Sequence, residues 1–507
     1  MTIPELLQTR AEELAQQTFV IFEDQDFSYH DVHEKACRVA ANLAKRGVGK
    51  GDKIVVLMGN CMEFIYLFLG AGRIGAVIVP VNPLLKPDEI AYITTNADAN
   101  TIVTIPEFAP MVPLVRKMLP QIKRIFIVGG DVVEGAEPFS VLLEPVDAVP
   151  EIGINEHDDA ALIYTSGTTG LPKGVILTHR NYIWNARAVQ RSNTIYPHDR
   201  FYCILPLFHV NAQVVSVLAP LIAKISLVLM GRFNALGILP AIEKHKITVM
   251  SAVPTIYNVI CSNPKVAEYD LSSIRFFVSG AAPLPEETYQ LILRVLKKPV
   301  LQGYGLSEAT CASAVADGFD PIRWNSCGPA LRYCGVRIVD SNGTDLPVGE
   351  IGEILVTGPT VMKGYYKNPE ATAEVLNNGW LHTGDLGRLD EEGYLYIVGR
   401  LKDMIIRGGQ NVYPAQVESV LLKLEGVAEA AVIGVDDPRW GQEVLAVIKR
   451  AQGSTITEKD VVSFAREHLA QYKCPRHVRF VDELPKTATG KVRKNVLAEQ
   501  VAAAGKT

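Results

Sequence analysis

The sequence lacks any pair of cysteines at the spacing of a metal site or a redox pair. Its eight cysteines, among them Cys37, Cys203, Cys327 and Cys474, are scattered, with no CxxC and no Cys/His spacing that would bind zinc. We therefore expect reduced thiols in a cytoplasmic protein.

The chain also lacks an excess of charge of either sign. Its formal net charge is -5, so its overall charge does not favour nucleic acid as a partner, and any phosphate must be bound by local residues. The opening segment MTIPELLQTRAEELAQQ is acidic where a signal peptide is basic and then apolar, and the final VAAAGKT is not a peroxisomal signal. We expect no export from the cell.

No apolar run is long enough to indicate a membrane-spanning helix. The longest, residues 214–230, is interrupted by Pro220 and Lys224, which favours buried elements of a soluble core. We expect no membrane span, and a monomer or homodimer.

The length of 507 residues exceeds what one hydrophobic core serves, so a large domain with a smaller one is expected. Apolar runs alternate with helical patterns such as residues 30–47, which predicts α/β layers with buried strands. The predicted strands lie within residues 53–60, 76–82, 100–105, 124–128, 224–230, 247–253 and 274–280.

From about Ala330 the pattern changes to short β runs with glycines, which predicts a meander or small barrel over residues 335–359. A glycine-rich junction at residues 399–414 then precedes a compact α+β pattern. The predicted fold is α/β: a large multi-layer N-terminal domain, residues 1–400, with two α/β layers and a small barrel-like subdomain. A smaller mobile α+β domain, residues 401–507, follows a hinge near Lys402.

The segment YTSGTTGLPKG, residues 164–174, follows an apolar run and combines glycines, hydroxyls and one lysine. A phosphate loop needs these components: backbone N–H groups that converge on an anion, glycines that allow the necessary dihedrals, hydroxyl donors and a cation. The segment fits neither GxxxxGK[ST] nor GxGxxG, so it is not one of the common nucleotide loops.

This segment resembles the signature of the adenylate-forming superfamily, which includes acyl-CoA synthetases, luciferases and the adenylation domains of peptide synthetases. Further segments resemble the family's other motifs, in the family's order: LQGYGLSEAT (301–310), LHTGDLG (381–387), GRLKD (399–403) and LPKTATGKVRK (484–494). The resemblance covers nearly the whole chain and is closest to fatty-acid–CoA ligases. It implies ATP, Mg²⁺ and coenzyme A as the small molecules bound.

The resemblance assigns catalytic roles to charged residues. Glu308 corresponds to a magnesium-binding glutamate, and Thr165 is a second metal candidate, because magnesium takes few protein ligands and completes its shell with phosphate and water oxygens. Lys491 corresponds to the lysine that reaches from the small domain to the reacting carboxylate and phosphate.

The resemblance also predicts the nucleotide contacts. Asp385 can accept hydrogen bonds from both ribose hydroxyls, and Arg400 can add donors. Ser307 stands where the family more often has threonine and keeps the hydroxyl. The other candidates are Thr165, Ser166, Gly167, Thr168, Thr169, Lys173, Ala281, Ala282, Gln302, Gly303 and Tyr304.

The second half-reaction is expected to use another orientation of the small domain. Lys402 matches the family's hinge position, and rotation there would present Gly408 and Gly409, which leave space for the pantetheine arm of coenzyme A. Arg232 is a further candidate for contact with coenzyme A, and Asn411 is a further cofactor-binding candidate.

His209, in PLFHVNAQ, resembles the histidine that borders the family's acyl pocket, where it would act as a gate. Apolar surroundings, and Gln302 where an arginine could pair with a second carboxylate, favour a monocarboxylic acid with a medium or long hydrocarbon tail. Asn211 and Gln213 could equally bind a polar, hydroxycinnamate-like or carnitine-like acid.

The predicted enzyme is therefore an AMP-forming acid–thiol ligase that makes an acyl-adenylate and then acyl-CoA. Transfer of the acyl group to a carrier protein or its oxidation, and a catalytically silent protein that only keeps the fold, are the alternatives.

Overall fold

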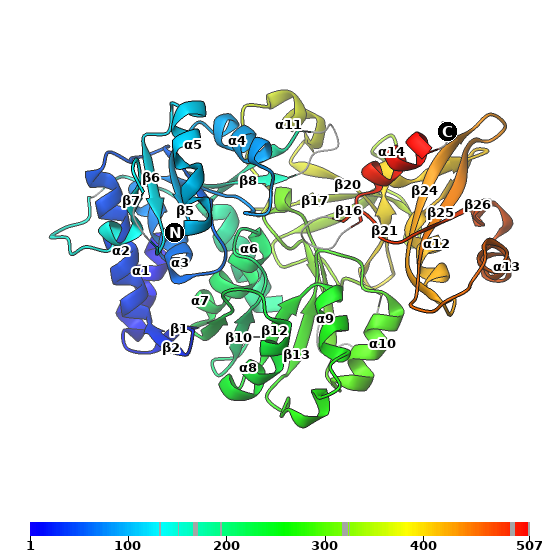
Figure 1. Ribbon diagram of the computed structural model, residues 1–507, viewed down its shortest axis with the longest axis horizontal. Helices are drawn as coiled ribbons and strands as arrows, with labels where there is room; N and C mark the ends of the chain where they lie inside the picture. Colours follow the sequence, from blue (N-terminus) through cyan, green and yellow to red (C-terminus); the bar gives the residue numbers. More distant parts are fainter. Residues whose placement is uncertain are drawn as a thin grey trace.

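The computed structural model describes residues 1–130, 133–150, 152–165, 171–192, 195–316, 323, 325–486 and 492–504. Among these residues the strands form four sheets, and the segments predicted as strands from apolar runs are strands (Figure 1). The expected α/β fold with a large N-terminal part and a smaller C-terminal part is confirmed.

The first sheet has eight strands. They are β3 (Lys53–Leu57), β4 (Val77–Pro80), β5 (Ala99–Thr104), β6 (Arg124–Ile127), β7 (Glu137–Pro138), β8 (Asp159–Thr165), β9 (Lys173–Thr178) and β18 (Gly364–Tyr365). Their order is β18-β9-β8-β4-β3-β5-β6-β7. Strands β8, β9 and β18 pair antiparallel and form one edge, whereas the other pairs are parallel.

The second sheet also has eight strands. They are β1 (Thr18–Phe22), β2 (Gln25–Ser28), β10 (Arg200–Cys203), β11 (Ser226–Leu229), β12 (Val249–Ala252), β13 (Phe276–Ser279), β14 (Val300–Tyr304) and β15 (Ala314–Val315). Their order is β15-β14-β13-β12-β10-β11-β1-β2, with parallel pairs in the middle. The central strands β12 and β13 are fully buried because both faces of the sheet are covered there, whereas the edge strand β2 is polar and has no buried residue.

Helices pack on both sheets, and one core joins them. The α-helices are α1 (Ile3–Leu14), α2 (Tyr29–Lys45), α3 (Met62–Gly70), α4 (Pro87–Asn96), α5 (Val112–Met118), α6 (His179–Ser192), α7 (Ala219–Ala223), α8 (Ile238–His245), α9 (Pro254–Cys261) and α10 (Glu286–Val295). The largest core includes Val56 of β3, Phe201 of β10 and Tyr182 of α6, so the two sheets share it. Every residue of α3 except Glu63 is buried, which accounts for its largely apolar character.

Short 3₁₀ and π-helical segments connect many of these elements. The 3₁₀ segments are η1 (Ala71–Ile74), η2 (Pro106–Met111), η3 (Phe139–Leu142), η5 (Ala235–Gly237), η6 (Val266–Glu268), η7 (Ser307–Ala309), η8 (Leu401–Asp403) and η9 (Gln471–Lys473), and η4 (Ala212–Leu218) is a π-helix. In the described residues no helix is long and apolar enough to cross a membrane, and the run at residues 214–230 is divided among η4, α7 and β11.

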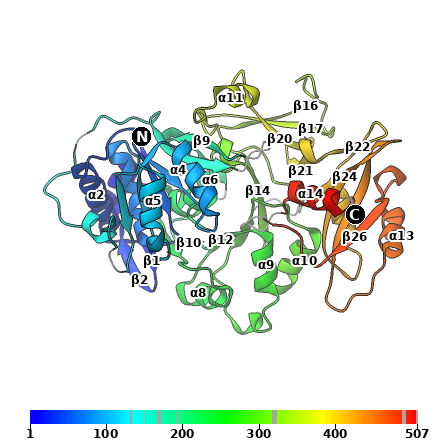
Figure 2. The same ribbon diagram turned by 45° about the horizontal axis from the view of Figure 1, so that its top comes forward.

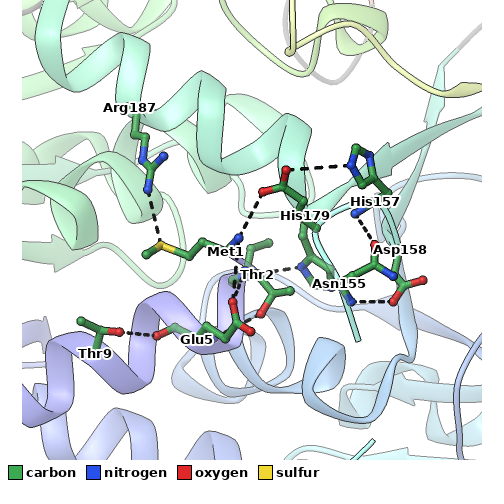
Figure 3. Close-up of polar contacts among 11 residues, drawn as sticks. Met1, Thr2, Glu5, Thr9, Asn155, His157, Asp158, His179 and Arg187 are labelled. Atoms are coloured by element: carbon green, nitrogen blue, oxygen red, sulfur yellow. Dashed lines mark hydrogen bonds and ion pairs between the residues drawn. The ribbon is translucent and has the colours of Figure 1, made fainter. Parts of the chain in front are cut away.

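The start of the chain is fixed by α6. The backbone N–H of Ile3 donates to Nδ1 of His179 at 3.4 Å, and Arg187 donates to the sulfur of Met1 at 3.5 Å (Figure 3). Helix α1 begins with a capping box, in which Thr2 and Glu5 satisfy each other's backbone N–H groups. The first helix is therefore part of the core rather than a loose extension.

A third sheet of five strands follows. Its strands are β16 (Gly335–Val339), β17 (Gly352–Thr357), β19 (Leu376–Asn377), β20 (Trp380–Leu389) and β21 (Leu395–Arg400), and α11 (Pro369–Val375) lies among them in sequence. All pairs are antiparallel. The short β runs expected over residues 335–359, as a meander or small barrel, are the antiparallel pair β16 and β17. The sheet extends beyond them, because β20 pairs with β17 and also with β19 and β21.

The C-terminal part forms the fourth sheet. Its strands are β22 (Ile405–Arg407), β23 (Gln410–Val412), β24 (Val427–Asp437), β25 (Gly441–Arg450) and β26 (His477–Val481), with helices α12 (Pro414–Leu421), α13 (Glu458–His468) and α14 (Lys494–Ala504). Figure 2 shows this unit beside β20 and β21. Lys423, two residues after the end of α12, pairs with Glu286 of α10 at 2.8 Å. The domain boundary near Lys402 stays a prediction; η8, which contains Lys402, connects the third sheet to the fourth.

Candidate functional site

The phosphate loop predicted at residues 164–174 leaves the end of a buried strand. Strand β8 ends at Thr165 and β9 begins at Lys173, and these two residues are paired across the antiparallel ladder. Strand β8 is anchored by its buried residues 160–163. Four predicted loop residues lie outside the described residues: Ser166, Gly167, Thr168 and Thr169. The two strand ends therefore present Thr165 and Lys173 at one edge of the first sheet.

Glu308, the predicted metal ligand, lies next to Thr165 at the end of β8. Its Oε1 atom accepts a hydrogen bond from Thr165 Oγ1 at 3.4 Å and a shorter one from Tyr365 Oη at 3.0 Å. The backbone carbonyl of Glu308 accepts from the N–H of Met362 at 2.8 Å. The structure therefore brings the motif at residues 164–174 into contact with the motif at residues 301–310.

This arrangement fits a magnesium ion of the kind that the resemblance implies. Carboxylate and hydroxyl oxygens are suitable ligands, and magnesium at phosphates needs only one or two carboxylates. No group of three or more His, Cys, Asp or Glu side chains in the described residues could hold a metal ion. Glu308 with Thr165 would thus have to share the ion with nucleotide phosphates.

The third predicted motif lies against the strand that precedes Glu308. Tyr304, at the end of β14, donates its hydroxyl hydrogen to Asp385 Oδ2 at 2.8 Å. Arg400 Nε lies 3.5 Å from Asp385 Oδ1, because β20 and β21 pair these two residues. Asp385 is therefore oriented from two sides, and its contacts extend the site into the third sheet.

The small residues predicted to border the nucleotide come from neighbouring strand ends. Strand β13 pairs with β14 so that Ser279 lies beside Gln302, and Ala281 and Ala282 follow this position. Ala281 is exposed and has a φ of 64°, a value that suits few residues with a side chain. Ser307 is half-buried in η7, and Gly303 is half-buried in β14.

The TGD turn that carries Asp385 is held by a residue that the motifs did not reveal. Glu353 Oε1 accepts from the backbone N–H of Gly384 at 3.1 Å, and its Oε2 lies 2.9 Å from Nδ1 of His382. Thr383 donates to the carbonyl of Ile354 at 2.7 Å. The turn is thus fixed to β17 by three hydrogen bonds.

The predicted acyl-pocket residues lie around η4. His209 is half-buried, its Nε2 atom is buried without a partner among the described residues, and burial lowers its pKa to about 4. Gln213 is fully buried, accepting from Tyr182 Oη at 2.6 Å and donating to the Leu207 carbonyl at 2.7 Å. In contrast, Oδ1 of Asn211 is buried with no described partner. Of the two amide side chains, that of Gln213 thus makes its hydrogen bonds within the core.

The residues predicted to serve the thioester step lie mainly on the fourth sheet. Gly408 and Gly409 form the two-residue turn between β22 and β23, with φ values of 57° and 81°. A Cβ on Gly408 would come within 2.6 Å of the Trp440 ring, whereas one on Gly409 would meet nothing within 4 Å. Asn411 is exposed on β23.

Other predicted residues stand apart from these clusters. Lys402 is exposed in η8, and Arg232 is exposed after β11. Lys491 lies outside the described residues. Arg407, next to the glycine turn, is paired with the buried carboxylate of Glu443.

Three residues near the site were missed by motif reasoning: Tyr365, Glu353 and Trp440. Each makes its contact through a strand pairing or a turn far away in sequence, so local spacing carries no signal for it. The segment GYYKNPE, residues 364–370, contains Tyr365 and extends into the start of α11, but nothing in it distinguishes this tyrosine from Tyr366.

Comparison with known proteins agrees with the fold and the motifs. A family model described as "AMP-binding enzyme" matches residues 7–366, and one described as "AMP-binding enzyme C-terminal domain" matches residues 416–491. A feruloyl-CoA synthase from Amycolatopsis sp is 37% identical over 470 residues, 92% of each chain. The long-chain-fatty-acid–CoA ligase FadD13 of Mycobacterium tuberculosis is 35% identical over 484 residues, 95% of this chain and 94% of its own.

Solved structures agree as well. The anthranilate CoA ligase AuaEII in complex with anthranoyl-AMP superposes with a TM-score of 0.93 at 29% identity, over 100% of this chain and 98% of that one. Fold and site together define an adenylate-forming enzyme of two unequal parts. The chain belongs to the AMP-binding enzyme family. The expected class, an AMP-forming acid–thiol ligase, is confirmed at this level.

Proposed function

We propose that the protein activates a monocarboxylic acid with ATP and transfers the acyl group to coenzyme A. The acid attacks the α-phosphate to give an acyl-adenylate and pyrophosphate, and the thiol of coenzyme A then displaces AMP. The first step brings two anions together, so catalysis consists mostly of positioning and of neutralising charge.

The contact network that runs from Thr165 through Glu308 to the end of β14 carries this proposal. Thr165 Oγ1 lies 3.4 Å from Glu308 Oε1. Four residues before Glu308, the hydroxyl of Tyr304 donates to Asp385 Oδ2 at 2.8 Å. Three motifs that are far apart in sequence thus converge as a bound nucleotide would require, with phosphates at one end and ribose at the other. A protein that merely kept the fold would not need this arrangement of charges.

We assign roles to the charged residues on this basis. Asp385 would accept hydrogen bonds from the ribose hydroxyls while Tyr304 and Arg400 hold its orientation. Lys173 would contact the phosphates, and Lys491 would stabilise the charge that develops between acid and α-phosphate. Magnesium, when bound by Glu308 and Thr165, would neutralise charge on the phosphate oxygens.

The nature of the acid divides the proposal into two versions. The apolar surroundings of His209 support a medium- or long-chain fatty acid, the substrate class named for FadD13. The unpaired Oδ1 of Asn211 supports an acid with a hydrogen-bond donor on its tail, such as the feruloyl group named for the Amycolatopsis relative. A carnitine-like acid is a third possibility that no described contact favours.

For the second step we propose that the small domain turns about Lys402 and brings the Gly408–Gly409 turn to the adenylate. The open space beside Gly409 supports passage of the pantetheine arm. Transfer to a carrier protein is the alternative. AMP release that needs coenzyme A supports the first account, and release that is unaffected by coenzyme A contradicts it.

A screen of pyrophosphate release over fatty, aryl and short acids tests the function and identifies the acid. Lys491→Ala should abolish adenylate formation while sparing thioester formation from supplied acyl-adenylate, because only the first step uses its charge. Equal losses in both steps would contradict the two-orientation scheme. ATP binding without pyrophosphate release for any acid would instead favour a catalytically silent protein. Cytoplasmic location and the oligomeric state stay predictions.

A further inference from the structure

Tyr365 contacts both charged groups that the proposed function places at the phosphates. Its hydroxyl donates to Glu308 Oε1 at 3.0 Å, and its ring centroid lies 5.1 Å from Nζ of Lys173. The first contact is a hydrogen bond to a carboxylate and the second is a cation–π contact. One side chain thus connects the candidate metal ligand to the candidate phosphate cation.

Strand pairing places Tyr365 at this point. Strand β18 adds to β9 so that Tyr365 lies opposite Val175, and the N–H of Tyr366 donates to the Gly174 carbonyl at 2.7 Å. Three residues earlier, the N–H of Met362 holds the backbone carbonyl of Glu308 at 2.8 Å. The segment 362–366 therefore fixes Glu308 through its backbone and its side chain while it covers the start of β9.

The two hydroxyl donors use the same oxygen of Glu308. Tyr365 and Thr165 both donate to Oε1, and Oε2 receives no hydrogen bond from the described part of the chain. The carboxylate is thereby held with one oxygen engaged and the other available to a cation.

We propose that Tyr365 is a positioning residue for ATP activation, which orients Glu308 toward the magnesium ion through its hydroxyl and Lys173 toward the phosphates through its ring. This inference rests on the proposed function, because that function puts the metal and the phosphates at Glu308 and Lys173. It assigns two separable tasks to two parts of one side chain. Hydrogen-bond partners of this kind commonly change metal affinity by about ten- to a hundredfold when they are removed.

Two substitutions separate the tasks. Tyr365→Phe keeps the ring beside Lys173 and removes only the hydroxyl, so it should raise the Mg²⁺ concentration for half-maximal pyrophosphate release by about tenfold and change the KM for ATP at saturating Mg²⁺ by less than about threefold. Tyr365→Leu also removes the ring, so it should in addition raise the KM for ATP by about fivefold.

The adjacent tyrosine supplies the control. Tyr366 donates its hydroxyl hydrogen to Asp98 at 2.9 Å, at the end of α4 and away from Glu308. Tyr366→Phe therefore removes the same group from the neighbouring position, and it should leave both the Mg²⁺ requirement and the KM for ATP unchanged.

Binding of Mn²⁺ to the protein with ATP, followed by electron paramagnetic resonance without any acid present, gives a readout that is independent of turnover. Weaker Mn²⁺ binding in Tyr365→Phe, with wild-type binding in Tyr366→Phe and similar melting temperatures for all three proteins, would support the inference. Wild-type Mn²⁺ binding and Mg²⁺ dependence in Tyr365→Phe would overturn it, whether or not the wild-type enzyme is active. Absence of pyrophosphate release from wild-type protein that still binds Mn²⁺ and ATP would instead contradict the proposed function alone.

Discussion

Glu353 accepts a hydrogen bond from the backbone N–H of Gly384 at 3.1 Å, one residue before Asp385. Its other oxygen lies 2.9 Å from Nδ1 of His382, so the carboxylate spans the turn that presents Asp385. Both contacts are partly buried, where hydrogen bonds to a charged group contribute about 1.5–3 kcal/mol. The orientation of Asp385 thus depends on a residue in the neighbouring strand β17.

Glu353→Ala should raise the KM for ATP by about tenfold, because loss of about 1.4 kcal/mol in the positioning of Asp385 corresponds to that factor. Glu353→Gln should stay within about threefold of wild type, since its amide oxygen can still accept from Gly384. Steady-state pyrophosphate release at varied ATP measures both effects. The exposed Glu350, in the turn before β17, provides the control variant Glu350→Ala. Equal KM values for Glu353→Ala and wild type would contradict the positioning role.

The two glycines of the β22–β23 turn should differ in their tolerance of alanine. Both have positive φ, so each alanine costs about 1–2 kcal/mol of backbone strain. Gly408→Ala would additionally force a Cβ to within 2.6 Å of Trp440, whereas Gly409→Ala meets no atom within 4 Å. Chemical denaturation should therefore show a larger loss in the free energy of unfolding for Gly408→Ala than for Gly409→Ala. In a Trp440→Ala background the two alanine variants should lose similar amounts. A difference that stays the same in that background would contradict the clash with Trp440.

Gly409 should matter for the thioester step in addition to the backbone strain that any side chain there would cause. The proposed passage of the pantetheine arm beside this residue predicts that Gly409→Leu slows acyl transfer to coenzyme A by about a hundredfold, since small misplacements of reacting groups have effects of that size. Adenylate formation should change by less than twofold. Single-turnover assays of each half-reaction measure the two rates. A variant with equal losses in both, or with a normal second step, would contradict the predicted channel.

Elements with a strong local pattern could be predicted from sequence, and contacts between them could not. The apolar run at residues 53–60 contains β3, because a strand buried on both faces is continuously apolar. The helical pattern at 30–47 contains α2, because burial of one face of a helix imposes a period on its residues. The apolar run at residues 214–230 predicts burial, and its residues in η4 are buried. The sequence does not predict that η4 is a π-helix, because this helix type has no distinctive apolar period.

The site shows the same division. The motif around Glu308 identified the residue, but its partner Tyr365 is 57 positions away and reaches it only because β18 pairs with β9. Glu353 is 31 positions from Gly384 and depends on the register of β17 with β20. Motifs therefore identified candidate ligands, whereas the residues that orient them follow from strand register.

The imidazole of His179 should make stability depend on pH. His179 is 1% exposed, its Nδ1 accepts from the N–H of Ile3, and its Nε2 has no described partner. Burial lowers its pKa from 6.5 to about 4; the charge of Asp158 raises the pKa and the N-terminal ammonium lowers it further, but burial is the largest effect. The folded protein therefore keeps this ring neutral at a pH where the unfolded chain protonates it.

Between pH 6.5 and about 4 the unfolded state binds the extra proton, so the free energy of unfolding should fall as the pH falls and be fully retained above pH 6.5. At about 1.4 kcal/mol per pKa unit the total loss would be about 3 kcal/mol. His179→Gln keeps an acceptor for the N–H of Ile3 without a ring that titrates. Urea denaturation of this variant between pH 6.5 and 4 should therefore show a free energy of unfolding that falls by about 3 kcal/mol less than in wild type. His157→Gln, at an exposed histidine of the same region (Figure 3), should keep the wild-type slope. A His179→Gln slope equal to that of wild type would show that the folded protein can accept a proton at this ring without losing the contact between α1 and α6.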